Sequence, residues 1–447
     1  MKLKFYIPLL IVAILSIFLI ITIAYKAINY INYQTNAFNE RLLAIEHNLK
    51  VINQKTNAAI LNIQNLSSEK IKEININSSQ FEFFVDENTS LNEFTLMNEE
   101  KYPITLKNLV INDRALPYSQ SDLVKLILKD KYIKTKEDEV IELFNFVRNK
   151  VQWDYPLNLT EEVSEPLKLL YVYGYGLCDD KASALVNLAG EIGVPGRLIE
   201  LGPPGYHVIA ELFYDGEWHL FDPDGGAYYQ KNGKVLSLNA IKEDLSVLDR
   251  FDGNDLIYEN RYSKKLIKGQ IEAEENILDI TDQFRFPSEH NLKIELKPGM
   301  SLSINKNLNP NLASRGYRNR LPQEAYLAKW SQEIFVDKKN DDLILESSFP
   351  YLYFEANLKG RRIVYSINDE LPIVHNVNSG KVKLLFDEKP VYKLKIYTKR
   401  SSSILSYDLY SQINSRLFPS LERGKNIIKF DDVNQPINLS LILSNKL

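Results

Sequence analysis

The sequence predicts an α+β protein with four parts: an N-terminal transmembrane helix, a helical stalk, an α+β core and a β-rich, sandwich-like C-terminal domain. Three observations lead to this prediction. Residues 5–25 carry no charge, residues 38–66 repeat apolar positions in a heptad pattern, and residues beyond 250 alternate apolar and polar side chains in short runs. The chain has 447 residues, which is enough for two or three domains.

The composition is that of an ordinary globular protein, with 45% hydrophobic and 25% charged residues. The formal net charge is −4 and the sequence pI is about 5.9. No broad positive field is present to hold a phosphate backbone, so nucleic acid is excluded as a partner. The heavy use of Ile, Asn, Lys and Tyr is typical of an AT-rich bacterial gene.

The uncharged run at residues 5–25 has the length of a membrane anchor. As a helix, its 21 residues span about 30 Å, which matches the hydrocarbon core of a bilayer. Lys2 and Lys4 precede the run, so the positive-inside rule predicts a cytoplasmic tip at residues 1–4. The bulk of the chain is then extracytoplasmic. The prediction is a single-pass membrane protein of the bacterial cell envelope.

Residues 34–75 are predicted to form a helical stalk. Positions from Phe38 to Leu66 recur with alternating spacings of four and three, and eight of these nine positions are apolar. This pattern is the seam of a coiled coil, which predicts a homo-oligomer formed through the stalk. The alternative is a single amphipathic helix that folds against its own domain, and the sequence leaves both open.

Periodicity also assigns the segments that follow. Residues 80–115 are predicted to form short strands and linkers. Thr135 has the features of a helix N-cap, because three acidic residues lie in the turn that follows it. An apolar stripe at helical spacing continues from there and is assigned to the core: Val140, Phe144, Val147 and Val151.

Cys178 is the single cysteine of the chain, which excludes an intramolecular disulfide and a cysteine-based zinc cluster. A lone cysteine is either a small buried hydrophobe or a nucleophile. A glycine-bearing loop ends at Cys178, and a helix is predicted to follow until Gly193 and Pro195. The positive end of a helix dipole favours a thiolate, so this position favours the nucleophile.

A hairpin downstream supplies partners for this thiol. Asp215-Gly216 is a strong signal for a two-residue turn between two strands. That turn places Tyr214 opposite Glu217 and, when the register is continued, brings His207 and Asp222 to one face as diagonal neighbours. His207 is therefore the candidate base, and Asp222 is the candidate carboxylate that orients its imidazole.

Other residues compete for these roles. Asp224 projects from the same face as Asp222, but it follows a proline in a glycine turn and ranks second for the orienting role. His219 projects from the opposite face and is assigned a structural role. The remaining histidines have no chemical residues clustered around them in the sequence: His47, His290 and His375.

Together these residues resemble the motifs of the transglutaminase-like superfamily. The run Gly176-x-Cys178-x-Asp180-x-Ala182 looks like its nucleophile motif, and residues 192–197 resemble the helix-to-strand join that follows it. Three further features resemble the histidine strand and the aspartate strand of this superfamily: His207, Asp215-Gly216-x-Trp218 and Asp222-Pro223. The resemblance covers residues 120–235.

This resemblance implies a papain-like α+β catalytic domain, assigned to residues 116–240, with a triad of Cys178, His207 and Asp222. It implies chemistry on amide bonds through a thioester on Cys178, with no metal and no organic cofactor. The substrate is then a protein or a peptide. A peptidase or amidase and an acyl transferase both fit, and hydrolysis is preferred because it needs only water.

The sequence departs from the family pattern after the histidine, where Val208 and Ile209 replace an aromatic residue common in the family. No side chain can be assigned to an oxyanion hole. Trp153 and Tyr155 lie upstream of the nucleophile and are interpreted as buried aromatic packing.

Residues 250–447 are predicted to form a β-rich domain. Leu292, Ile294 and Leu296 alternate with polar residues, and turn residues separate this run from others like it. Short strands with regular turns predict a β-sandwich. Such a domain keeps two non-catalytic alternatives open: an envelope scaffold, and a surface protein that binds carbohydrate or protein.

Overall fold

The computed structural model describes the chain from Lys72 to Leu443, with gaps. The described residues are 72–76, 79–85, 93–153, 164–202, 207–249, 268–269, 277–283, 291–305, 325–333, 342–386, 390–414, 416–431 and 437–443. They belong to one compact unit, Ile71–Leu447. The predicted anchor and the predicted stalk before residue 72 lie outside the described residues. Within the part that is described, no helix is both long and apolar enough to cross a membrane.

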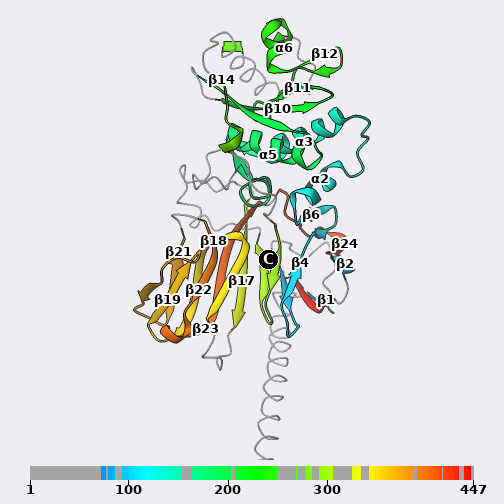
Figure 1. Ribbon diagram of the computed structural model, residues 1–447. Helices are drawn as coiled ribbons and strands as arrows, with labels where there is room; N and C mark the ends of the chain where they lie inside the picture. Colours follow the sequence, from blue (N-terminus) through cyan, green and yellow to red (C-terminus); the bar gives the residue numbers. More distant parts are fainter. Residues whose placement is uncertain are drawn as a thin grey trace, which may run out of the picture. The chain divides into compact units, whose positions relative to one another are not determined.

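Three helices form one layer of the α+β core (Figure 1): α2 (Gln120–Leu128), α3 (Lys136–Lys150) and α5 (Cys178–Glu191). The predicted N-cap of α3 is confirmed, because the Thr135 side chain accepts a hydrogen bond from the Asp138 N–H and the Asp138 carboxylate accepts one from the Thr135 N–H. The apolar stripe of α3 is buried, as predicted. This stripe packs the helix into the core beside α5.

A four-stranded antiparallel sheet forms the second layer, in the order β11 (Glu217–Phe221), β10 (His207–Tyr214), β9 (Gly196–Leu201) and β14 (Ile277–Asp279). The hairpin register is the predicted one, with Tyr214 paired to Glu217. Asp215 and Gly216 form the turn, both at positive φ. Helix α5 lies against β10 and β9, as Figure 1 shows.

The other face of this sheet carries a smaller apolar cluster that includes Ile209 and Leu220. It is covered by α6 (Leu238–Glu243) and by the 3₁₀ turn η5 (Leu245–Asp249). A short hairpin of β12 (Gln230–Lys231) and β13 (Lys234–Val235) precedes α6. A further 3₁₀ turn, η6 (Thr281–Gln283), follows β14, and the Thr281 hydroxyl accepts a hydrogen bond from the Leu198 N–H. Both faces of the sheet are therefore packed, which fixes β10 and β11.

The segment before α5 combines several short elements: α4 (Pro166–Lys168), the π-helix η4 (Leu169–Tyr173) and β8 (Tyr175–Gly176). Strand β8 pairs in parallel with β7 (Gln152–Trp153), so that Trp153 lies opposite Gly176. The π-helix ends at Gly174, which has a φ of 73°. These short elements lead directly into α5.

The β-rich part consists mainly of one antiparallel sheet of 11 strands. Its strands run in this order: β1 (Lys72–Ile76), β25 (Leu439–Leu443), β3 (Glu93–Asn98), β16 (Ser301–Asn305), β17 (Ala325–Glu333), β23 (Ser403–Asn414), β18 (Leu343–Lys359), β22 (Val391–Ile396), β19 (Arg362–Ile367) and β20 (Ile373–Asn376), with β21 (Lys381–Leu385) also paired to β18. The 3₁₀ turn η7 (Thr398–Arg400) joins β22 to β23.

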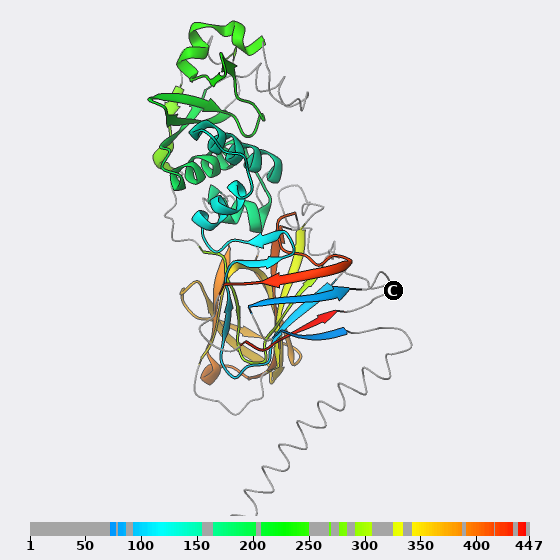
Figure 2. The ribbon, with the colours of Figure 1, turned by 90° about the vertical axis from the view of Figure 1, so that its right-hand side faces the viewer.

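Two smaller sheets accompany the large one. The first has the order β2 (Gln80–Val85), β24 (Gly424–Lys429), β5 (Leu109–Ile111) and β6 (Arg114–Leu116), and the second pairs β15 (Ile294–Leu296) with β4 (Ile104–Leu106). In Figure 2 the blue strands from the start of this unit lie among the red strands from its end. The β-rich part is therefore built from both ends of the sequence, with the α+β core between them.

Several predicted boundaries are wrong for this reason. The predicted stalk reaches residue 75, but residues 72–76 form β1 and pair with β25. Segment 80–115 contains short strands, as predicted, but these strands pair with strands of the β-rich part and do not form a separate region. The β-rich domain was placed at 250–447, yet residues 277–279 complete the sheet of the core through β9. Each correction involves a pairing between distant segments, which local periodicity does not encode.

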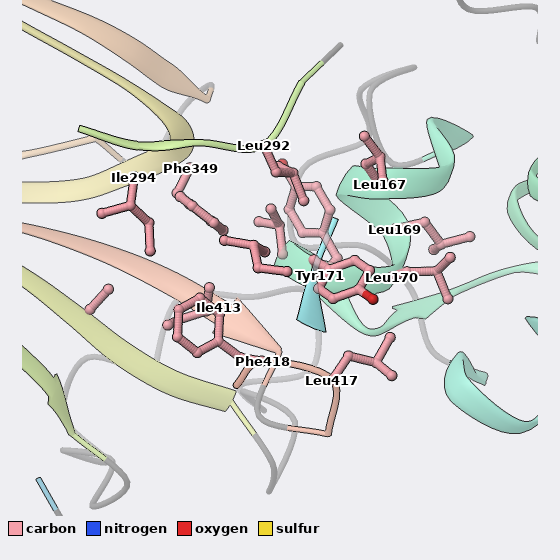
Figure 3. Packing of buried hydrophobic residues seen from close by; sticks show 14 of the residues in the cluster. Leu167, Leu169, Leu170, Tyr171, Leu292, Ile294, Phe349, Ile413, Leu417 and Phe418 are labelled. Atoms are coloured by element: carbon pink, nitrogen blue, oxygen red, sulfur yellow. The ribbon is translucent and has the colours of Figure 1, made fainter. Parts of the chain in front are cut away.

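Apolar packing joins the β-rich part to the π-helix η4 (Figure 3). Leu170 and Tyr171 of η4 lie beside Ile413, Leu417 and Phe418, and all five belong to one buried cluster. The segment that leads to Cys178 is thus held by residues more than 200 positions away in the sequence.

Candidate active site

Cys178 is the first residue of α5, and its side chain is partly exposed. The turn around it is closed by Asp180, whose carboxylate accepts hydrogen bonds from the Leu177 N–H at 2.9 Å and from the Ser164 hydroxyl at 2.7 Å. Burial, together with the neighbouring charge of Asp179, raises the pKa of Asp180 to about 6. The start of the helix is therefore fixed by a buried carboxyl group rather than by an exposed cap.

Gly176 allows this close turn. A Cβ atom at that position would lie 2.8 Å from Cβ of Asp180 and 2.9 Å from a methyl group of Leu169. Such contacts are too short for any side chain, so only glycine lets the chain approach the helix here. The glycine of the predicted nucleophile motif thus has a steric explanation.

His207 is the first residue of β10 and is almost fully buried. Its Nε2 lies 2.9 Å from Oδ2 of Asp222, and Cys178 lies close enough to raise the pKa of the imidazole. Since Nε2 faces Asp222, Nδ1 is the ring nitrogen left for the thiol. The structure therefore brings the three predicted residues together, with the imidazole between the thiol and the carboxylate.

Opposing influences act on the imidazole of His207. Burial lowers its pKa, but the charge and the hydrogen bond of Asp222, together with Cys178, outweigh burial and hold the pKa well above its ordinary value. The protonated imidazole is thus favoured beside the cysteine. An imidazolium in this position stabilises a thiolate by charge.

Asp222 follows β11 and is completely buried. Its backbone forms a bridge with Ala227, with N–H···O distances of 2.8 and 2.9 Å. Its Oδ1 accepts a hydrogen bond from the Gly225 N–H at 2.7 Å, which leaves Oδ2 for His207. Both carboxylate oxygens are therefore engaged, so the carboxylate is held in one orientation.

Asp224 and His219 occupy different surroundings. Oδ1 of Asp224 lies 2.8 Å from Nζ of Lys181, so this carboxylate is paired with a lysine on α5. His219 is buried, stacks on Tyr214, and has its two ring nitrogens against the carbonyl oxygens of Val235 and Tyr214. His375 lies in β20 at the edge of the large sheet, while His47 and His290 are outside the described residues.

Trp153 was interpreted as buried packing, and this interpretation is wrong: its side chain is 52% exposed. The short strand β7 carries it at the surface and pairs it with Gly176, two residues before Cys178. Tyr155 lies outside the described residues. Lys181 was not singled out from the sequence, although its position one helical turn after Cys178 is a signal that could have identified it.

The first turn of α5 also provides backbone donors. Burial is the main cause that raises the pKa of the Asp179 carboxyl group, and the backbone N–H groups of Asp179 and Asp180 act in the opposite direction. The N–H of Cys178 is likewise one of the leading amides that have no acceptor within the helix. It is placed to donate to an oxygen atom held above the thiol.

Residues 128–223 match the family model of the transglutaminase-like superfamily. The chain therefore contains a transglutaminase-like core, within a mixed structure of few helices and many strands. Cys178, His207 and Asp222 all lie inside the matched segment. No curated protein and no solved structure matches the chain.

Proposed function

We propose that this protein is a cysteine-dependent enzyme that acts on amide bonds of proteins or peptides. In this proposal Cys178 is the nucleophile, His207 is the general acid and base, and Asp222 orients the imidazole. The observation that supports it most directly is the buried His207, which is hydrogen-bonded to Asp222 and lies close enough to Cys178 for the cysteine to raise the pKa of the imidazole. The match to the transglutaminase-like superfamily, whose members are typically cysteine-dependent enzymes, supports it further.

The proposed reaction begins when the Cys178 thiolate attacks the carbonyl carbon of the substrate amide. The carbonyl oxygen becomes negatively charged, and the N–H of Cys178 donates a hydrogen bond to it. The C–N bond then breaks, and the imidazolium of His207 gives its proton to the leaving amine. The products of this half-reaction are a free amine and a thioester between Cys178 and the acyl group.

The thioester is resolved by a second nucleophile. Neutral His207 takes a proton from water or from an acceptor amine as that group attacks the thioester carbon, and the thiolate of Cys178 leaves. Water gives a peptidase or amidase, whereas an amine gives an acyl transferase. We place hydrolysis first because it requires no second binding site.

We also propose that residues 5–25 anchor the protein in a bacterial membrane, with the core outside the cytoplasm. The length of the uncharged run and the lysines before it support this location. The heptad pattern from Phe38 to Leu66 supports association of identical chains through the stalk. The enzyme would then act on envelope proteins or peptides within reach of the membrane surface.

A thiol-reactive probe tests the proposed chemistry on the full-length chain. Because Cys178 is the single cysteine, every labelled molecule reports this residue. We expect labelling to disappear in Cys178→Ala and to slow by about a hundredfold at neutral pH in His207→Ala. Labelling at the rate of a free thiol, unchanged in His207→Ala, would instead favour a non-catalytic scaffold. Incubating the thioester with and without an added amine then separates transfer from hydrolysis.

A further inference from the structure

A second buried ion pair lies beside the proposed triad. Nζ of Lys181 is 2.8 Å from Oδ1 of Asp224, and the two side chains are only 5% and 10% exposed. Lys181 follows Cys178 by three residues on α5, and Asp224 follows Asp222 by two residues on the adjoining loop. The pair therefore connects the nucleophile helix to the loop that carries the orienting carboxylate.

Asp224 is placed to compete for the imidazole. Burial raises the pKa of Asp224, the charge of Lys181 opposes this, and the charges of Asp222 and His207 also act on it. Two carboxylates of one short loop thus lie within the electrostatic reach of a single His207. A buried carboxylate without a cation is strongly disfavoured, so Asp224 would take the nearest available cation if Lys181 were absent.

The remaining acidic groups at this site have partners of their own. The backbone N–H groups at the start of α5 favour the ionised form of Asp179, and Asp180 accepts hydrogen bonds from Leu177 and Ser164. The two cationic side chains pair with different carboxylates: His207 faces Asp222, and Lys181 faces Asp224. Each of the two loop carboxylates, Asp222 and Asp224, therefore has a cationic partner of its own.

From this division we propose that Lys181 is a positioning residue that holds Asp224 away from His207, so that Asp222 alone orients the imidazole. The inference rests on the proposed function, because it concerns the geometry of the His207 ring toward the thiol. Without Lys181, Asp224 draws the ring out of line with Cys178. The lysine thereby selects which of two nearby carboxylates serves the histidine.

A simpler role for the pair is mechanical: it ties α5 to the loop after β11. The two roles predict different results when the partners are removed singly and together. Under the mechanical role, Lys181→Met, Asp224→Asn and the double variant all break the same tie and have the same effect. Under the proposed role, Lys181→Met is harmful by itself, and Asp224→Asn reverses that harm because the competing charge is gone.

The experiment measures the rate of alkylation of Cys178 by iodoacetamide, from about pH 5 to about pH 9, in the full-length protein. We expect Lys181→Met to slow alkylation near neutral pH by roughly 10- to 100-fold and to give a pH profile like that of His207→Ala. Asp224→Asn and the double variant should stay within about threefold of the wild type. Lys181→Arg, which keeps the ion pair, should also retain the wild-type profile.

Arg197→Met is the matched control, because Arg197 forms another ion pair with a buried carboxylate of the same sheet, Glu211, at 2.6 Å. It should lower the melting temperature without changing the shape of the pH profile. Equal slowing in Lys181→Met and in the double variant would overturn the proposal. If His207→Ala leaves the alkylation rate unchanged, the proposed function is wrong. If His207→Ala slows alkylation but Lys181→Met and the double variant are slowed equally, only the proposed role of Lys181 is wrong.

Discussion

The side-chain amide of Asn414 donates a hydrogen bond to the carbonyl oxygen of Leu170, with a distance of 2.6 Å. Asn414 is the last residue of β23, and Leu170 lies in the π-helix η4 eight residues before Cys178. Gly174 ends that π-helix directly against the Asn414 side chain. The β-rich part therefore supports the segment that leads to Cys178.

Gly174→Ala should disturb this support. The residue has a φ of 73°, and a Cβ there would lie 2.6 Å from Cγ of Asn414. We expect a loss of about 3 kcal/mol in the free energy of unfolding, from backbone strain and displacement of a buried side chain, together with slower alkylation of Cys178. Urea unfolding and alkylation kinetics measure the two effects.

Gly193→Ala is the control for Gly174→Ala. Its φ is 74°, but no atom lies within 4 Å of the added Cβ. Gly193→Ala should therefore lose only the free energy of backbone strain, on the order of 1 kcal/mol of unfolding free energy, and should leave the alkylation rate of Cys178 unchanged. Equal losses in the two variants would mean that the contact with Asn414 contributes nothing.

Asp222→Asn should shift the titration of His207. Burial lowers the pKa of this imidazole, and the charge of Asp222 outweighs it, so the variant should lose the proton at a lower pH than the wild type. In the wild type the raised pKa contributes stability that is fully present below about pH 6.5 and is lost as the pH rises through the folded-state value. NMR titration of the histidine ring protons in the folded protein measures the shift.

Asp180→Asn should reveal the protonation state of this buried carboxyl. Its pKa is raised to about 6 in the folded protein, so the protonated form stabilises the fold below about pH 4. That contribution is lost between about pH 4 and about pH 6, because the unfolded chain ionises first. Relative to the variant, the wild type should lose about 3 kcal/mol of unfolding free energy across this range. A trend in the opposite direction would show that the ionised carboxylate is the stabilising form.

Local signals predicted the parts of the site that depend on neighbouring residues. Asp215-Gly216 specified a two-residue turn, and the turn set the register that brings His207 toward Asp222. A loop glycine followed by a helical pattern placed Cys178 at a helix start. These features follow from backbone conformations that a few consecutive residues determine.

The rest of the fold depends on pairings that the sequence does not display. Strand β1 pairs with β25, and β14 pairs with β9, although long segments separate the partners. A strand pattern shows which face is apolar but not which strand will lie beside it. The same holds for the ion pair of Lys181 and Asp224, which joins a helix to a loop 43 residues away in the sequence.

The location proposed for the protein predicts the side of the membrane on which its C-terminus lies. A reporter fused after Leu447 should be active outside the cytoplasm, because the lysines precede the uncharged run at residues 5–25. Replacing Lys2 and Lys4 with glutamine should weaken this orientation. A reporter active only in the cytoplasm would contradict both the anchor and the envelope location.

The stalk proposal predicts a difference in mass between two truncated chains. A chain that starts at Gln34 should sediment as an oligomer, because it keeps the heptad positions from Phe38 to Leu66. A chain that starts at residue 71 keeps β1 and should sediment as a monomer. Monomeric masses for both would leave only the single amphipathic helix.

In the sequence, the core lies between the two halves of the β-rich part. This arrangement sets the order in which the core and the β-rich part can fold during synthesis. Residues 120–279 leave the ribosome before β23, so the core can fold while Asn414 is still untranslated. Strand β3 must likewise wait for β16 and β25, its partners on either side. The nascent chain therefore carries Cys178 long before Asn414, which contacts the segment that leads to Cys178, has been synthesised. Full reactivity of Cys178 should consequently appear only when translation is nearly complete.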